Sequence, residues 1–143
     1  MINSFVGPCR FLSNFYPSEI TYEGITYPTV EHAFQASKTT ILSLRAGMAL
    51  LPTPDEAKKA GRKLALRADW EDIKDQVMED CVRLKFAIPE LKEKLLATGD
   101  EELVEGTWWH DQYWGICFCD LHQGKGENHL GKILMKIREE LKD

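Results

Sequence analysis

Residues 27–38 read YPTVEHAFQASK and predict a helix that begins at Val30 and extends to Lys38. Thr29 stands at the N-cap position, where its hydroxyl can accept a hydrogen bond from the first turn. Three polar side chains, spaced by four and three residues, fall on one face of this helix: Glu31, Gln35 and Lys38. Two interpretations stay open. The face is either a solvated surface with a helical ion pair, or a carboxylate, an amide and an amine that point into a cleft.

The segments around this helix predict a helix-rich α+β fold with a small antiparallel β-hairpin or sheet. The hairpin is expected at residues 18–27, with its turn at residues 23–24. Caps and apolar spacing predict further helices at residues 54–67, 70–88, 90–97 and 129–141. Their expected N-caps are Thr53, Asp69 and Asn128. Short strands at residues 103–105 and 113–119 complete a single domain that spans residues 1–143.

Two of these helices carry apolar stripes at helical spacing. The first stripe consists of Ile73, Val77, Cys81 and Leu84, and the second of Leu130, Ile133, Leu134, Ile137 and Leu141. We expect both stripes to face the core.

Length and charge narrow the class of protein. With 143 residues and a net charge of −5, the chain can build one core but is too acidic to be held on nucleic acid by bulk charge. No apolar run approaches the roughly 20 residues of a membrane-spanning helix. The first residues lack the pattern of a signal peptide. We therefore expect a cytoplasmic protein without a membrane partner, whose cysteines stay reduced.

An unusual aromatic segment lies at residues 108–115, WWHDQYWG. Its aromatic rings either pack in the core or form a platform on which a planar base stacks. Asp111 correspondingly either caps a turn or serves as a second carboxylate beside Glu31. Gly115 would allow close approach of a ligand to the backbone.

The segment at residues 124–128, GKGEN, precedes the last expected helix. It lacks the spacing of a P-loop, so it is either a plain capped loop or a turn whose backbone N–H groups hold a phosphate.

Cys117, Cys119 and His122 are potential metal ligands, with His110 and His129 near them in sequence. A Cys-x-Cys pair on a strand would place both thiols on one face and matches no standard zinc spacing. The sequence therefore favours no metal, and no cofactor is expected.

Short motifs, in order along nearly the whole chain, resemble the NADAR domain family of YbiA-like N-glycosidases. They are Phe5-x-Gly7, FLSNFY at 11–16, YPTVEHAFQAxK at 27–38, Ala57-x-x-x-Gly61-Arg62, Trp70, Val77-Met78, Lys85-Phe86, Leu96-x-Thr98-Gly99, Leu103-Val104-Glu105, Asp111-x-x-Trp114-Gly115, and Gly126-x-Asn128-x-Leu130-Gly131-x-x-Leu134-Met135. The chain departs from the family pattern at residues 108–110 and 117–119, where we expect the base pocket to differ.

The resemblance implies a hydrolase that cleaves the bond between a ribose C1 and a base nitrogen. The family's catalytic positions correspond to Glu31, Trp70 and Asp111, and Lys38 stands where the family carries a helix lysine. We expect substrate-binding roles for Arg10, Asn14, His32, Gln35, Trp114, Gly115, Gly126 and Asn128.

Two chemical routes fit these residues. In the first, Glu31 stabilises the oxocarbenium-like sugar or activates water, and Asp111 moves the proton, although the two roles could be exchanged. In the second, a neutral Lys38 amine forms an imine at C1 and expels the base.

The resemblance leaves two substrate classes open: ADP-ribose on a guanine base of nucleic acid, which the compact chain favours, and ribosylated pyrimidine intermediates of riboflavin synthesis. The expected partners are thus an ADP-ribose or ribosyl-nucleotide ligand and a single-stranded DNA or modified guanine base. A rival of another class is a non-catalytic module that binds ADP-ribose or a nucleotide. It would not need Glu31, Asp111 and Lys38 together, and the oligomeric state is not predicted.

Overall fold

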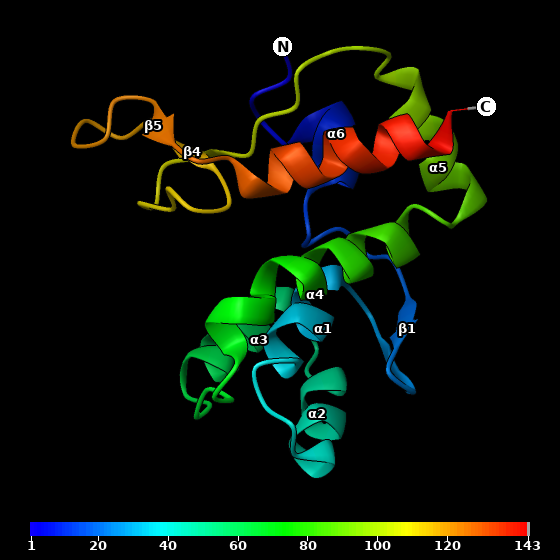
Figure 1. Cartoon of the computed structure of the whole chain (residues 1–143), viewed down its shortest axis with the longest axis vertical. Coiled ribbons are helices and arrows are strands. Elements are labelled where there is room, and N and C mark those ends of the chain that lie inside the picture. Colours follow the sequence, from blue (N-terminus) through cyan, green and yellow to red (C-terminus); the bar gives the residue numbers. More distant parts are fainter. Residues whose placement is uncertain (143) are drawn as a thin grey trace. The chain divides into compact units, whose positions relative to one another are not determined.

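The computed structural model describes residues 1–142 and contains two compact units (Figure 1). One unit is Asn14–Ala87, and the other combines Met1–Ser13 with the chain from Ile88 onward. The first unit holds β1 (Ile20–Tyr22), β2 (Ile25–Tyr27), α1 (Val30–Ala36), α2 (Leu42–Ala49), α3 (Pro54–Arg62) and α4 (Trp70–Lys85). The second holds the 3-10 helix η1 (Gly7–Leu12), α5 (Pro89–Ala97), β3 (Gly106–Thr107), β4 (Ile116–Cys117), β5 (Lys125–Gly126) and α6 (His129–Leu141). In the described part of the chain, none of the helices has the length and apolar character needed to cross a bilayer.

The expected hairpin is confirmed in the Asn14–Ala87 unit. β1 and β2 pair antiparallel, with Ile20 opposite Tyr27. The turn residues Glu23 and Gly24 have φ values of 49° and 85°. A two-residue hairpin turn of type I′ needs positive φ at both positions, which Gly24 adopts without cost.

Helix α1 is the centre of this unit, because α2, α3 and α4 all pack against it. Its seven residues are all buried. The predicted cap is confirmed, since Thr29 Oγ1 accepts a hydrogen bond from the His32 amide at 3.1 Å. Burial of a whole helix places its polar residues inside the unit as well as its apolar ones.

The other helices of this unit correct several predictions. Helix α2 was not predicted, because its N-cap Ile41 has no side-chain acceptor to mark a start. Helix α3 begins under the predicted Thr53 cap but ends at Arg62 rather than Arg67. Asp69 does not cap α4, because its carboxylate pairs with Arg67 at 2.6 Å.

The buried stripe of α4 also differs from its prediction. Val77 and Cys81 are buried as expected, whereas Ile73 is only half-buried and Leu84 is 38% exposed. The helix turns Lys85 inward instead, and this lysine is 1% exposed.

The second unit holds a small mixed sheet with strand order β3-β4-β5. β3 and β4 pair in parallel, and β4 and β5 pair antiparallel. The expected antiparallel pairing is thus found in the β1–β2 hairpin, whereas this second sheet is mixed. The predicted strand at residues 103–105 is wrong apart from a bridge between Ile2 and Leu103. The predicted strand at residues 113–119 shortens to β4, because the chain enters a turn after Cys117.

Helix α6 packs on α5 and buries its predicted stripe, except that Leu141 is half-buried. Asn128 precedes α6 with φ 53° and makes no cap hydrogen bond, so the predicted cap is wrong. Its side chain instead accepts from the Glu105 amide and donates to the Leu103 carbonyl, each at 3.0 Å. Asn128 therefore fastens residues 103–105 to the start of α6.

Candidate active site

The polar face of α1 is buried. Glu31 is 8% exposed and Gln35 5% exposed, and Lys38, just beyond the helix, is half-buried. The interpretation of a solvated face with a surface ion pair is therefore wrong. Burying a carboxylate and an amine is costly unless neighbouring groups compensate each of them, so their surroundings decide what this face can do.

Glu31 and Gln35 form a buried pair. Gln35 Nε2 donates to Glu31 Oε2 at 3.0 Å, which orients the carboxylate. Gln35 Oε1 has no hydrogen-bond partner among the described residues and lies against Gly61 of α3. A side chain at Gly61 would overlap this oxygen, so the missing Cβ is what lets α3 pack this close to α1.

Burial and three nearby charged side chains shift the pKa of Lys38. Burial lowers its pKa, the negative charge of Glu31 raises it, and the positive charges of Arg62 and Lys58 lower it again. The net direction is down from the ordinary value, which increases the neutral fraction of the amine. The i, i+4 spacing of Lys58 and Arg62 on α3 was visible in the sequence, but the packing of α3 on α1 that brings them to Lys38 was not.

His32 is almost fully buried, and both of its ring nitrogens have partners. Nδ1 lies 2.8 Å from Thr29 Oγ1 and Nε2 lies 3.0 Å from the Leu51 carbonyl. Burial lowers the pKa of His32, while the hydrogen bond to Leu51 raises it to a smaller extent. This side chain ties α1 to the segment after α2, and the binding role expected for it stays a prediction.

Trp70 and Asn14 also lie beside α1. Trp70 is 5% exposed at the start of α4, and its ring centroid is 5.1 Å from that of Phe34 on α1. Asn14 is half-buried, and its carbonyl accepts a hydrogen bond from the Glu31 amide at 3.1 Å. Both residues therefore contact the helix that carries Glu31, Trp70 by packing and Asn14 by holding its first turn.

Lys85 of α4 is a residue that the sequence reading did not select for function. Its Nζ lies 5.7 Å from the ring centroid of Tyr16 and 5.1 Å from that of Phe86, distances at which a cation and an aromatic ring attract. Its signals in the sequence were its position four residues after Cys81 and its place in the Lys85-Phe86 motif.

Asp111 belongs to the second unit and organises its own loop. Its Oδ1 accepts hydrogen bonds from the amides of Tyr113 and Trp114, at 3.1 and 2.9 Å. Its carbonyl accepts from Thr107 Oγ1 at 2.9 Å. The turn-capping interpretation is thus confirmed, and it holds the carboxylate in one orientation.

The aromatic segment divides into two parts. Trp114 is half-buried and meets the His129 ring edge-on, while Tyr113 stacks on the same ring at 4.0 Å. Trp108 and Trp109 are 66% and 53% exposed, so packing of the whole segment in the core is wrong.

Backbone of the same unit lies against Gly115 and Gly126, the two glycines at which we expected contact with a ligand. A Cβ at Gly115 would overlap the Glu105 carbonyl, and one at Gly126 would overlap the Gly115 carbonyl. These glycines allow the strands to pack closely.

The backbone N–H groups at the start of α6 donate hydrogen bonds to carbonyls of the same unit. The amides of Asn128, His129 and Leu130 donate to the carbonyls of residues 115, 113 and 114, at 3.0 to 3.2 Å. A phosphate at residues 124–128 would therefore need side chains, and Arg10, which is exposed on η1, stays a candidate for such a contact.

The structure thus brings Glu31, Gln35 and Lys38 together with Lys58 and Arg62 in one unit, and Asp111 with Trp114 in the other. The family model of the NADAR domain matches residues 4–142. The chain belongs to the NADAR family. Over 132 residues, this NADAR chain is 42% identical to N-glycosidase YbiA of Escherichia coli (strain K12), covering 90% of the chain and 79% of that relative.

Two further comparisons concern the fold and the substrate class. An NMR structure of the E. coli protein YbiA matches the NADAR chain with a TM-score of 0.81 and 37% identity, over 99% of this chain and 84% of that one. A riboflavin biosynthesis protein of Vibrio vulnificus (strain YJ016) is 40% identical over 136 residues, which is 93% of this chain and 36% of that protein. The predicted family, the α+β fold and the enzyme class, a hydrolase of N-glycosyl bonds, are confirmed.

Proposed function

We propose that this NADAR chain hydrolyses the C1–N bond that joins ADP-ribose to a guanine base of nucleic acid. The observation that supports this most is the buried Glu31–Gln35 pair with Lys38, Lys58 and Arg62 around it. A carboxylate suits the positive charge that develops on the sugar, and the cations suit a ribose that carries phosphates. The exposed rings of Trp108 and Trp109 offer faces on which a base of a single strand can stack.

In the carboxylate route, the C1–N bond breaks and its electron pair goes to the leaving nitrogen, which takes up a proton from solvent. Glu31 stabilises the oxocarbenium-like C1 and removes a proton from the attacking water. The products are ADP-ribose with a C1 hydroxyl and the free base. We propose binding roles for Asn14 and Trp70 beside Glu31, and the roles expected for Asp111 and Trp114 stay predictions.

A second candidate is hydrolysis of a ribosylated pyrimidine phosphate of riboflavin synthesis. The name of the V. vulnificus relative favours it, and the same carboxylate and cations would serve it. This substrate is a free metabolite, so it would not need the exposed tryptophans.

Mass-resolved turnover tests the proposal directly. We expect release of ADP-ribose from an ADP-ribosylated guanine in a short single-stranded DNA, and its loss in Glu31→Ala. Turnover of a ribosylamino-pyrimidine phosphate alone would replace the proposal with the second candidate. If neither substrate is turned over but ADP-ribose raises the melting temperature, the chain is a binding module.

The imine route makes a separate prediction for Lys38. It needs the neutral amine, whose fraction rises with pH, so kcat should rise through a pKa below the ordinary lysine value of 10.5. The C1–Nζ bond would form as the C1–N bond to the base breaks and the base takes up a proton. The C1–O4′ bond of the ribose ring would then open to give the imine, which water hydrolyses to free Lys38. Borohydride added during turnover should reduce the imine to a stable adduct on Lys38.

The control for this measurement is Lys59→Met, an exposed lysine on α3, which should leave both the trapping and the pH profile unchanged. An actively turning mixture that yields no adduct on Lys38 would exclude the imine and leave the carboxylate route.

A further inference from the structure

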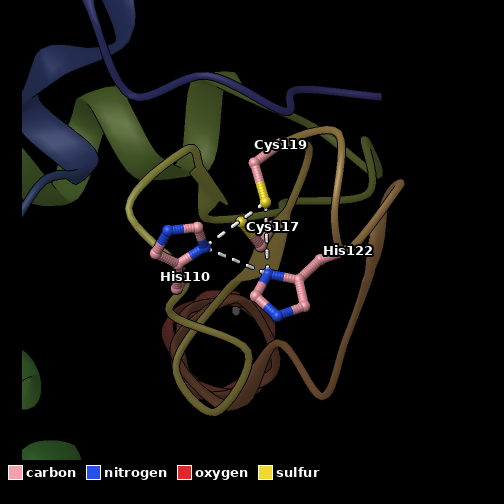
Figure 2. Close-up of side chains that lie close together, drawn as sticks. All are labelled: His110, Cys117, Cys119 and His122. Atoms are coloured by element: carbon pink, nitrogen blue, oxygen red, sulfur yellow. Dashed lines mark hydrogen bonds between the residues drawn. The ribbon is translucent and has the colours of Figure 1, made fainter.

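Four metal-binding side chains meet at one point in the second unit, outside the proposed catalytic groups (Figure 2). They are His110, Cys117, Cys119 and His122. Cys117 ends β4, Cys119 and His122 lie in the turn between β4 and β5, and His110 comes from the loop before β4. One donor atom from each lies within 4.8 Å of the other three.

The separations between these atoms fit a tetrahedral zinc ion. Cys119 Sγ lies 3.2 Å from His122 Nδ1 and 3.4 Å from His110 Nδ1. The two Nδ1 atoms are 3.4 Å apart. With the usual Zn–N and Zn–S bond lengths, a tetrahedral site separates two nitrogens by about 3.4 Å and a nitrogen from a sulfur by about 3.6 Å.

Hydrogen bonds account poorly for this triangle of atoms. An imidazole nitrogen carries either one N–H or one lone pair in the plane of the ring, never both. A closed triangle of hydrogen bonds would require the N–H of one Nδ1 to serve two acceptors and the single lone pair of the other Nδ1 to accept two protons. A metal ion at the centre, in contrast, accepts one lone pair from each of them.

The backbone holds the four residues in these positions. Cys117 is fully buried, and its carbonyl accepts from the Gly124 amide at 2.7 Å. The Cys119 carbonyl accepts from the His122 and Gln123 amides, at 3.2 and 2.8 Å. His110 has φ 71°, a left-handed conformation that a residue other than glycine adopts only where its surroundings fix it.

We propose that His110, Cys117, Cys119 and His122 bind one zinc ion as a closed structural site. The sequence favoured no metal, because the Cys-x-Cys spacing matches no standard zinc site and both cysteines were expected on one strand. The strand ends at Cys117, so the turn redirects the second thiol toward the first. All four ligands come from protein, which is typical of structural rather than catalytic zinc. The ion would pin the loop that carries Asp111, the neighbour of His110, to the β4–β5 turn.

Metal analysis of the full chain, produced with zinc and kept under a thiol-free reductant, tests this proposal. We expect about one zinc per chain in the wild type and less than about a tenth in Cys117→Ser. The matched control is Cys9→Ser, a half-buried cysteine far from the cluster in sequence, which should keep its zinc. A wild type that stays without zinc, a Cys117→Ser variant that keeps its zinc, or a Cys117–Cys119 disulfide that persists in reductant would overturn the proposal.

Cobalt gives a second readout that does not depend on a variant. Co²⁺ added to metal-free wild type should give the intense visible bands of a tetrahedral ion and a near-ultraviolet thiolate-to-cobalt band. The thiolate band should weaken in Cys119→Ser and persist in Cys9→Ser. The weak spectrum of octahedral Co²⁺ in the wild type would exclude the site, whether or not the cysteine variants fold.

Discussion

Replacing Glu31 with glutamine should lower kcat by about 10²–10⁴-fold, the range that a positioned acid–base group contributes. The substitution keeps the shape of the side chain and leaves an oxygen to accept the Gln35 hydrogen bond. It removes the negative charge that, in the proposed mechanism, faces the developing oxocarbenium ion. Single-turnover kinetics on the proposed substrate would measure the loss at the chemical step.

The matched control is Glu19→Gln, which removes the same charge from an exposed position in the same unit. Its kcat should equal that of the wild type. Both variants should melt within about 4 °C of the wild type, which corresponds to less than about 1 kcal/mol of unfolding free energy. If Glu31→Gln kept wild-type kcat, Glu31 would have no part in catalysis.

Glu31→Gln should also change the pH dependence. The negative charge of Glu31 raises the pKa of Lys38 against burial and the nearby cations. Without it, this pKa should fall further, so any residual activity that depends on neutral Lys38 should rise at a lower pH than in the wild type.

The largest loss of stability is expected for Gly131→Ala in α6. A Cβ at this position would overlap the Leu103 carbonyl and both amide atoms of the Asn128 side chain. The helix must then move away from residues 103–105, or Asn128 must give up its two hydrogen bonds while staying buried. Overpacking costs about 1–3 kcal/mol, and each buried group left unsatisfied costs a similar amount. Loss of both Asn128 bonds leaves groups unsatisfied on Asn128, Glu105 and Leu103. We therefore expect the unfolding free energy to fall by roughly 2–4 kcal/mol after the gain in helix propensity.

Gly47→Ala provides the comparison for this measurement. Gly47 is exposed in α2, and a Cβ there meets no atom within 4 Å. This variant should be unchanged or stabilised by up to about 1 kcal/mol. Urea unfolding of the two variants and the wild type measures the differences in unfolding free energy. They follow from the urea concentrations at the midpoints, provided that the m values of the three proteins agree. Equal midpoints for the two variants would show that α6 does not need the close approach at Gly131.

Local signals in the sequence were sufficient for part of the fold. Thr29 and Thr53 cap their helices as predicted, because a cap involves only the next three residues. Asn128 was misread for the opposite reason: its partners, Leu103 and Glu105, lie more than 20 residues away in sequence. The backbone conformation that turns its side chain toward them follows from the packing of residues 103–105.

The sequence was sufficient to predict which polar residues of the first helix share a face, but not that this face is buried. The spacing of Glu31, Gln35 and Lys38 is the same on a solvated helix and on a buried one, and the packing of three other helices makes the difference. Lys58 and Arg62 show the same limitation, since only that packing relates them to Lys38.

Because all residues of α1 are buried, the candidate site should persist until the Asn14–Ala87 unit itself unfolds. A helix that is covered on every side and packed by three neighbours does not open by fraying, and its amide protons exchange with solvent only when the surrounding structure comes apart. Glu31 and Gln35 therefore stay aligned as long as the Asn14–Ala87 unit is folded. Heat or denaturant should accordingly abolish this arrangement in a single step with global unfolding of the unit, rather than by gradual loosening beforehand.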